Sequence, residues 1–171
     1  MWGNNNISMN LSFIIPTLNE EQTLLSNLIF LKKIRKYLNA ELIVVDGGSH
    51  DSTVNIAKTL SCKVYISKPS RSKQFNLGAK HASGKYLVFL HADTVLDNDA
   101  INHLKKINKN TQWGFFNIKI KSNSFKYKML SALINIRSRL FNYATGDQVM
   151  IVENNFFYRV KGFKEMYLME D

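Results

Sequence analysis

Three apolar runs in the first half of the sequence each end in a group of polar, small or acidic residues. The groups are residues 16–20 (PTLNE), 46–49 (DGGS) and 91–94 (HADT). If the runs are parallel strands, the groups meet at the carboxyl ends of the sheet, where open α/β sheets bind ligands. Carboxylates there can hold a hard cation or accept a proton. One group alone is equally well explained by helix capping, but three together favour a ligand site.

Alternating strands and helices would bring these groups together. Apolar residues recur at helical spacing from Leu24 to Leu38, after a Thr17–Glu20 pair with capping-box spacing. The expected strands are 11–15, 41–46, 63–66 and 85–90, and the expected helices are 24–38, 52–60 and 71–82. This order predicts an α/β fold with a mostly parallel sheet flanked by helices.

The pattern changes after residue 96. We expect a helix over 97–108, an alternating strand over 113–121 with one wet face, an amphipathic helix over 125–141, a strand over 148–152 and a short helix before Gly162. No repeat or low-complexity linker interrupts the chain, and 171 residues suit one domain, so 1–171 is expected to be a single domain.

Composition excludes several classes of protein. The 45% hydrophobic content is that of a globular chain, and the single cysteine, Cys62, excludes an internal disulfide framework. The N-terminus lacks the pattern of a signal peptide, and no apolar stretch reaches the roughly 20 residues that span a bilayer. The expected location is therefore cytoplasmic.

The net charge of +10 is concentrated in one segment. Between Ala100 and Gly146 there is no Asp or Glu, whereas nine lysines and arginines occur there. Two interpretations fit these residues: a solvated face, or, together with the apolar stripe of helix 125–141, a surface for an anionic membrane. Recognition motifs for nucleic acid are absent, so no nucleic-acid partner is expected.

Five segments carry a family resemblance: SFIIPTLNEE, ELIVVDGGSHDST, LHADT, ATGDQ and the terminal LMED. In this order and spacing they resemble the inverting family 2 glycosyltransferases of the GT-A (nucleotide-diphospho-sugar transferase) fold, and among these the subgroup associated with radical-SAM and selenodomain proteins. The resemblance runs from about Ser12 to Asp171. It implies a nucleotide-binding half over 1–96 and an acceptor half over 97–171.

The resemblance also assigns roles to individual residues. It implies nucleotide contacts from the two loops after the first strands, diphosphate contacts from an R-x-x-Q-x-N segment, a metal ligand at the end of HAD, an acceptor side formed by GDQ, and a catalytic base in the terminal Glu-Asp pair. His91 stands where the family commonly has a first Asp. The implied residues are Pro16, Thr17, Asn19, Glu20, Asp46, Gly47 and Gly48 for the nucleotide; Arg71, Gln74 and Asn76 near the diphosphate; His91 and Ala92 beside the metal ligand Asp93; Gly146, Asp147 and Gln148 for the acceptor; and Glu170 with Asp171 as the base.

The implied activity is transfer of a sugar from a nucleoside-diphosphate sugar, a UDP-sugar above all, to an acceptor hydroxyl with inversion, as in a hexosyltransferase. Mg²⁺ or Mn²⁺ offsets the charge that builds on the leaving diphosphate, and one aspartate suffices as protein anchor if the diphosphate supplies further oxygens. Zinc is not expected, because the lone cysteine and scattered histidines lack ligand spacing. The acceptor is unnamed and lipid linkage is one possibility, with peripheral contact at the inner face of a membrane.

Alternatives from other classes remain. A nucleotidyltransferase would open on a glycine-rich phosphate loop with a basic residue, which IIPTLNEE does not supply. A non-catalytic sugar-nucleotide-binding protein or inactive fragment is the serious rival, because Asp171 is the last residue and the family continues further. The sequence therefore leads us to expect a form truncated at its C-terminus.

Overall fold

The computed structural model describes residues 11–107, 110–120, 122 and 124–164. Six strands form one sheet in the order β3-β2-β1-β4-β6-β5. The strands are β1 (Leu11–Thr17), β2 (Ala40–Asp46), β3 (Lys63–Ile66), β4 (Tyr86–Phe89), β5 (Trp113–Phe115) and β6 (Met150–Glu153). The first four are parallel, and β6 runs antiparallel to both β4 and β5. This confirms the predicted α/β fold with a mostly parallel sheet.

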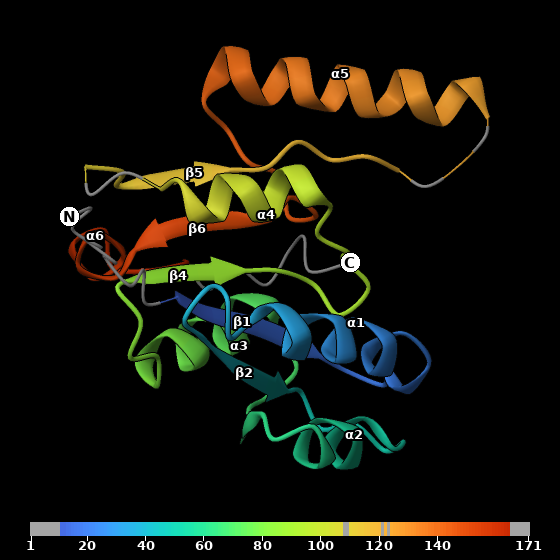
Figure 1. Cartoon of the computed structure of the whole chain (residues 1–171), viewed down its shortest axis with the longest axis vertical. Coiled ribbons are helices and arrows are strands. Elements are labelled where there is room, and N and C mark those ends of the chain that lie inside the picture. The colour runs from blue at the N-terminus through green and yellow to red at the C-terminus, as the bar shows by residue number, and fades with distance from the viewer. Residues whose placement is uncertain (1–10, 108–109, 121, 123, 165–171) are drawn as a thin grey trace, which may run out of the picture.

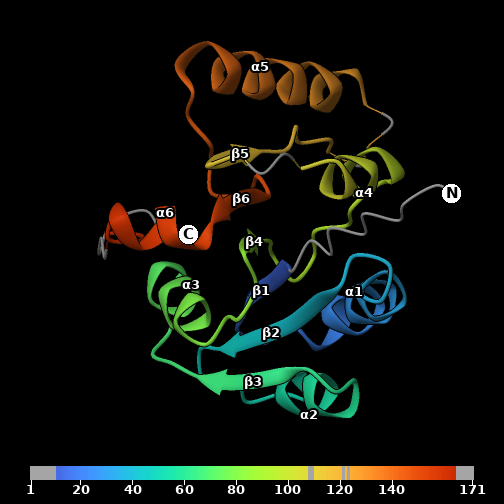
Figure 2. The same cartoon turned by 60° about the vertical axis from the view of Figure 1, so that its left-hand side comes forward.

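Helices cover both faces of the sheet (Figure 1, Figure 2). They are α1 (Glu21–Ile34), α2 (Thr53–Thr59), α3 (Arg71–Lys80), α4 (Asn98–Lys105), α5 (Phe125–Phe141) and α6 (Asn154–Arg159). Side chains of α1, α2 and α4 join one buried cluster with alternate residues of β1, β2 and β4, and side chains of α3 and α6 join a second cluster on the opposite face. The apolar runs of β1, β2 and β4 are therefore buried on both sides, as expected of a parallel sheet, whereas the outer strand β3 is partly exposed.

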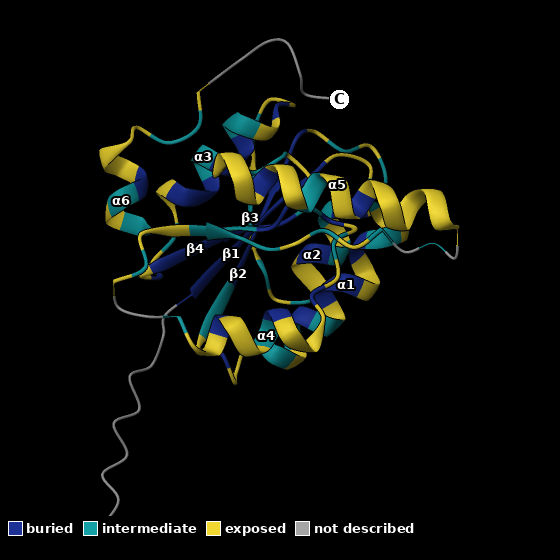
Figure 3. Ribbon diagram, turned by 90° about the horizontal axis from the view of Figure 1, so that it is seen from above, coloured by how far each residue is buried: buried dark blue, intermediate teal, exposed yellow. Residues whose placement is uncertain are grey.

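Helix α5 is arranged differently from the others. It lies beyond the β5 edge of the sheet, with the chain from β5 running beneath it (Figure 1, Figure 2). Its residues are mostly exposed (Figure 3).

Two local predictions were wrong. Glu20 is the N-cap residue of α1 but makes no side-chain cap bond, and the Thr17 hydroxyl donates instead to Asp46 at 2.9 Å. The strand expected over 113–121 is only Trp113–Phe115, because its partner β6 begins at Met150, opposite Phe115. Beyond one further backbone bond from Phe116 to Val149, the chain has no strand to pair with in the described residues.

Glu41 joins the amino ends of the four parallel strands. Its carboxylate accepts from the Ser12 hydroxyl of β1 at 2.6 Å, from the Lys63 ammonium of β3 at 2.5 Å, and from the backbone N–H of Ser83, just before β4, at 2.6 Å. Burial opposes ionisation of this carboxyl, but these hydrogen bonds together outweigh it and hold the pKa of Glu41 at about 2. We call this set of hydrogen bonds, which joins Glu41 to Ser12, Lys63 and Ser83, the Glu41 staple. It lies at the amino ends of the parallel strands, whereas the three polar groups lie at their carboxyl ends.

Candidate functional site

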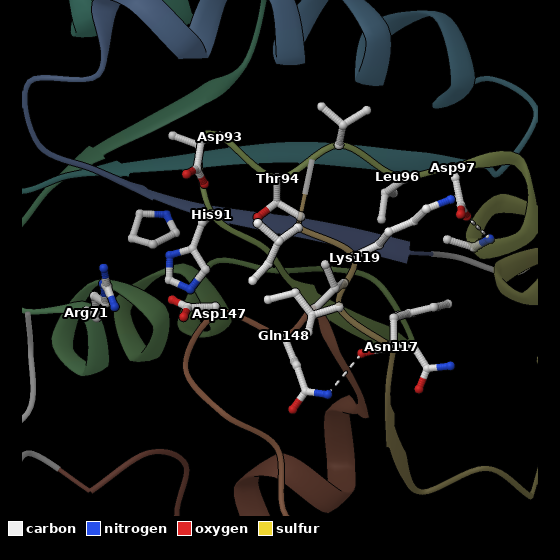
Figure 4. A pocket seen from close by; sticks show the side chains of 18 of the residues that line it. Arg71, His91, Asp93, Thr94, Leu96, Asp97, Asn117, Lys119, Asp147 and Gln148 are labelled. Carbon is white, nitrogen blue, oxygen red and sulfur yellow. Dashed lines mark hydrogen bonds between the residues drawn. The ribbon is translucent and has the colours of Figure 1, made fainter. Parts of the chain in front are cut away.

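A cavity of about 1120 Å³ opens at the carboxyl ends of β1 and β4 (Figure 4). The residues after β1 and β4 line it together with the first turns of α3 and α4, the chain 116–120, and residues 147–149, which lead into β6. Because β6 is antiparallel to β4, its first residues reach the same edge of the sheet at which the parallel strands end. The topology therefore collects segments from all parts of the chain around one cavity.

Most of the implied site residues face this cavity. Those that line it are Pro16, Thr17, Glu20, Arg71, Gln74, His91, Ala92, Asp93, Asp147 and Gln148. Asn19, Asp46, Gly47, Gly48, Asn76 and Gly146 are close in the chain to these residues but do not line the cavity. Glu170 and Asp171 lie outside the described residues. The catalytic role implied for this pair stays a prediction.

Both oxygens of the Asp46 carboxylate accept hydrogen bonds from neighbouring residues. One oxygen accepts from the hydroxyls of Thr17 at 2.9 Å and Ser49 at 2.5 Å, and the other accepts from the backbone N–H groups of Gly48 at 2.9 Å and Ser49 at 2.7 Å. Asp46 is 1% exposed. Gly48 has a φ of 97°, in the left-handed region that glycine adopts without strain. In this arrangement Asp46 shapes the loop after β2, and its contact with a nucleotide base stays a prediction.

The loops after β1 and β2 also hold each other. The Asn19 N–H donates to the Ser49 hydroxyl at 2.8 Å, and the Asn19 side-chain oxygen accepts from the His50 N–H at 3.0 Å. The Glu20 N–H donates to the Thr53 hydroxyl at 2.8 Å, at the start of α2. These cross-loop bonds fix the position of the cavity wall formed by Thr17, Leu18 and Glu20.

The amide side chains of the R-x-x-Q-x-N segment bind backbone groups. Gln74 is 4% exposed and donates to the carbonyl oxygens of Thr17 at 2.9 Å and Val45 at 2.7 Å, which joins the ends of β1 and β2. Asn76 donates to the Phe163 carbonyl at 2.9 Å and accepts from the Phe163 N–H at 3.0 Å. Both amides therefore position the chain around the site, and a direct contact between either one and a diphosphate stays a prediction.

Gln148 has a similar positioning role in the segment before β6. Its side-chain oxygen accepts from the Ser138 hydroxyl of α5 at 3.0 Å and from the Thr145 N–H at 2.8 Å, while its nitrogen donates to the Phe116 carbonyl at 3.2 Å. The residue is 2% exposed. One amide thus connects α5, the loop before β6 and the chain after β5.

The charged or titratable side chains around the cavity include Arg71, His91, Asp93 and Asp147, which lie near one another (Figure 4). Asp93 and Asp147 are exposed, and no hydrogen bond or ion pair reaches either carboxylate from another residue in the described ranges. Arg71 is likewise exposed at the start of α3. Two acceptor groups and one fixed positive charge are therefore available to a ligand.

His91 contacts both Gly146 and Phe75. Its Nε2 contacts the carbonyl oxygen of Gly146, which can only accept, so Nε2 carries the hydrogen. The ring of Phe75 packs against it edge to face, with 5.9 Å between ring centres. In the neutral ring Nδ1 is then left as an acceptor.

The carboxylate oxygens around the cavity fit a hard divalent cation that takes most of its other ligands from a bound diphosphate. Among the described residues no group of three or more His, Cys, Asp or Glu side chains is close enough to form a metal cage. A single carboxylate such as Asp93 can still anchor Mg²⁺ or Mn²⁺, since these ions accept phosphate and water oxygens for their remaining positions. The geometry therefore agrees with an ion that binds together with a diphosphate.

The sequence analysis missed Asn27, which supports the cavity wall from behind, and several residues that line the cavity. Asn27 of α1 is 3% exposed and donates to the Ala92 carbonyl at 3.0 Å, which holds the HAD segment in place. The available signal was its position inside the apolar stripe of α1, where a polar residue requires a partner. Asp97, Asp99 and Lys119 also line the cavity. Asp97 caps α4, and Lys119 had been assigned to a wet strand face.

Comparisons with known proteins agree with this architecture. The family model for glycosyl transferase family 2 matches residues 12–167, and the chain belongs to that family. Among curated relatives, a dolichol-phosphate mannosyltransferase from Pyrococcus furiosus is 34% identical over 108 residues, 60% of this chain and 31% of its own. A poly-beta-1,6-N-acetyl-D-glucosamine synthase from Staphylococcus epidermidis is 33% identical over 96 residues, 53% of this chain and 23% of its own. The chain thus spans less than a third of the length of these relatives.

Solved structures support the same fold. The glucosyl-3-phosphoglycerate synthase of Mycobacterium tuberculosis, solved with Mn²⁺, UDP and glucosyl-3-phosphoglycerate, superposes with a TM-score of 0.63 at 19% identity, over 85% of this chain and 57% of its own. A mannosyltransferase from Pyrobaculum calidifontis, solved with GDP-Man and Mn²⁺, gives a TM-score of 0.62 at 18% identity, over 90% and 47%. The predicted GT-A fold is confirmed.

Proposed function

We propose that this chain transfers a sugar from a nucleoside-diphosphate sugar to an acceptor hydroxyl with inversion, assisted by Mg²⁺ or Mn²⁺. The observation that carries the proposal is the exposed Asp93 carboxylate, beside His91 and Arg71 in a cavity at the carboxyl ends of the strands. Family membership and the two nucleotide-bound, Mn²⁺-bound structural neighbours support it. A UDP-sugar is the preferred donor in this proposal, with residues 1–96 forming the nucleotide half and 97–171 the acceptor half.

In this proposal each charged or polar residue of the cavity has a separate role, which depends on its charge. Asp93 holds the metal ion, which supplies positive charge to the leaving diphosphate. The Arg71 guanidinium adds a second, fixed positive charge that donates hydrogen bonds to phosphate oxygens. In the tautomer in which His91 donates from Nε2 to Gly146, Nδ1 is an acceptor, which suits a sugar hydroxyl. Asp147 lies on the acceptor side, and the Glu170–Asp171 pair takes the proton from the attacking hydroxyl.

The proposal also concerns the acceptor and its location. We include a lipid-linked acceptor and a peripheral contact with the inner face of a membrane, because the acid-free segment between Ala100 and Gly146 gives the acceptor half a large positive charge. The segments that carry the resemblance also favour the radical-SAM and selenodomain-associated subgroup.

Asp93→Asn tests the metal and donor together. In thermal melts, UDP should stabilise the parent protein only with Mn²⁺ or Mg²⁺ present, by about 2.7 kcal/mol at a hundredfold excess over the dissociation constant. Asp93→Asn should remove the metal-dependent stabilisation. Asp99→Asn is the matched control, because it removes a carboxylate from the rim of the same cavity. Asp46 substitutions are less informative here, since that carboxylate also holds the loop after β2.

Turnover separates the enzyme from a non-catalytic binding protein. Release of UDP from a UDP-sugar, measured with and without metal, should be metal-dependent in the parent and lost in Asp93→Asn. Metal-dependent stabilisation without any release of UDP would favour the binding protein instead. Equal metal-dependent stabilisation of Asp93→Asn and the parent would refute the assignment of Asp93.

A further inference from the structure

Helix α5 contacts the rest of the protein through polar side chains. Its buried residues are Ser131 and Ser138, and Asn135 lies between them on the same face. The Asn135 amide accepts from the Ile118 N–H at 2.8 Å and donates to the Ile118 carbonyl at 2.9 Å. The Ser131 hydroxyl accepts from the Ile120 N–H at 3.1 Å, and the Ser138 hydroxyl donates to Gln148 at 3.0 Å. The face that an amphipathic helix turns to the protein is here its polar face.

A stripe of apolar residues on α5 points away from the protein. Its five residues fall within a sector of roughly 80° on the helix, because successive residues turn by about 100°. This sector lies opposite the Ser131–Asn135–Ser138 face. The apolar stripe consists of Phe125 (78% exposed), Met129 (52%), Leu133 (56%), Ile136 (55%) and Leu140 (73%). A contiguous exposed apolar surface of this kind marks an interaction site.

Basic residues border the apolar stripe on both sides. The same helical spacing places Lys126 and Arg137 along one border and Lys128 and Arg139 along the other. α5 itself contains no acidic residue. Exposed aromatic rings stand at its two ends, with Phe125 at the start and Phe141 and Tyr143 at the finish. Long basic side chains that flank an apolar face reach the headgroups while their stems stay with the apolar groups.

The charge pattern discriminates between possible occupants. A second copy of this chain would bring two acid-free, positively charged helices together, which repel each other. A nucleic acid would meet the basic borders but would leave the apolar stripe in water. An anionic lipid surface satisfies both the stripe and its two borders.

The length of α5 fixes its orientation. Seventeen residues make a helix of about 25 Å, shorter than the roughly 30 Å of a hydrocarbon core. No helix in the described ranges is long and apolar enough to cross a membrane. We infer that α5 is an interfacial anchor, which lies in the plane of an anionic membrane with its apolar stripe inserted among the lipids. The inference rests on the peripheral contact included in the proposed function and assigns it to named residues.

The anchor also borders the site. Leu130 and Ile134 of α5 line the cavity together with Ile118 and Ile120. On the helix they lie between the apolar stripe and the docked face. An anchored α5 would therefore bring an apolar wall of the cavity next to the lipid surface, which suits an acceptor whose hydroxyl is carried on a lipid.

Liposome sedimentation tests the anchor. The parent protein should bind vesicles of phosphatidylcholine with phosphatidylglycerol and bind pure phosphatidylcholine at least tenfold more weakly, with the difference shrinking at high salt. The double substitution Met129→Gln with Leu133→Gln should weaken binding about tenfold or more. Each of Lys126→Gln and Arg137→Gln should weaken it about fivefold. Leu25→Gln with Ile29→Gln is the matched control, because these α1 residues are 46% and 41% exposed and lie on another helix.

The thermal melts with UDP and metal ion described above distinguish a folding defect from loss of membrane binding. The Met129→Gln, Leu133→Gln protein should keep the metal-dependent stabilisation by UDP, so failure of the anchor and failure of the sugar-transfer proposal give different results. Unchanged vesicle binding of that protein, equal loss in the α1 control, or equal binding of the parent to neutral vesicles would overturn the inference. So would a parent dimer in sedimentation equilibrium that the stripe substitutions convert to monomer.

Discussion

Glu41→Gln should weaken the fold in a way that depends on pH. The carboxylate of Glu41 holds β1, β3 and the turn before β4 through Ser12, Lys63 and Ser83. Glutamine keeps the shape and one acceptor oxygen but loses the charge. The substitution therefore separates the contribution of the negative charge of Glu41 to stability from the contribution of its side-chain packing.

The expected magnitude follows from the pKa of this group. Its fall from 4.5 to about 2 in the folded protein corresponds to about 3 kcal/mol of stability. The side chains of Glu41 and Lys63 are 17% and 50% exposed, so solvent screening reduces the value, and we expect about 1–2 kcal/mol. Because the folded-state pKa lies below the unfolded one, this stability is fully present above the unfolded value of 4.5 and is lost as the pH falls towards 2.

Urea denaturation of the parent and Glu41→Gln at about pH 7 and about pH 3.5 measures the effect. The parent should be more stable by about 1–2 kcal/mol at the higher pH, and part of this difference should disappear at the lower pH, where the folded-state carboxyl with its pKa of about 2 is still largely ionised. Glu153→Gln is the control, since that carboxyl lies in the same sheet and accepts no side-chain hydrogen bond in the described part of the chain. If the difference in unfolding free energy between the parent and Glu41→Gln stays constant with pH, the electrostatic explanation is refuted. The difference would then come from packing alone.

Two further predictions concern other buried positions. Gly84→Ala should cost about 2–3 kcal/mol in urea denaturation, because its Cβ would lie 2.6 Å from the Ser12 hydroxyl and 2.7 Å from the backbone of Leu11, whereas Gly114→Ala, whose Cβ meets Ile151 at 3.6 Å, should change stability little. Burial raises the pKa of the Cys62 thiol from 9.0 to about 11, so its reaction with a thiol reagent near pH 8 should be about a hundredfold slower than in the urea-unfolded chain. Equal rates in the two states would contradict the half-buried position of this thiol.

The parts of the fold that sequence could predict depend on local pattern. The four parallel strands were found because each is a short apolar run bounded by turn residues, and α5 was found from its apolar spacing. The Thr17–Glu20 capping box failed because Asp46, 29 residues away in the chain, takes the Thr17 hydroxyl. No local pattern contains that competitor.

The site was predictable in outline for a similar reason. Groups at the ends of parallel strands must share an edge, so the cavity residues His91, Asp93 and Thr17 follow from topology. The roles of Gln74 and Gln148 do not follow, because an amide that binds a phosphate and one that binds a carbonyl look identical in sequence. Nor could the pattern show that the apolar stripe of α5 faces outwards, since the same spacing is found in helices packed on a sheet.

The pairing of Asn135 with Ile118 also bears on how copies of this protein avoid one another. β5 is the last strand of the sheet on its side, and the chain that follows it would offer free N–H and C=O groups to a strand from a second molecule. The Asn135 amide takes both backbone groups of Ile118, and Ser131 takes the N–H of Ile120. A helix side chain thus stands in the place of an incoming strand. The helix that presents an apolar face to its surroundings is thus the same one that occupies the backbone groups of the chain after β5, which a strand from another molecule would otherwise pair with.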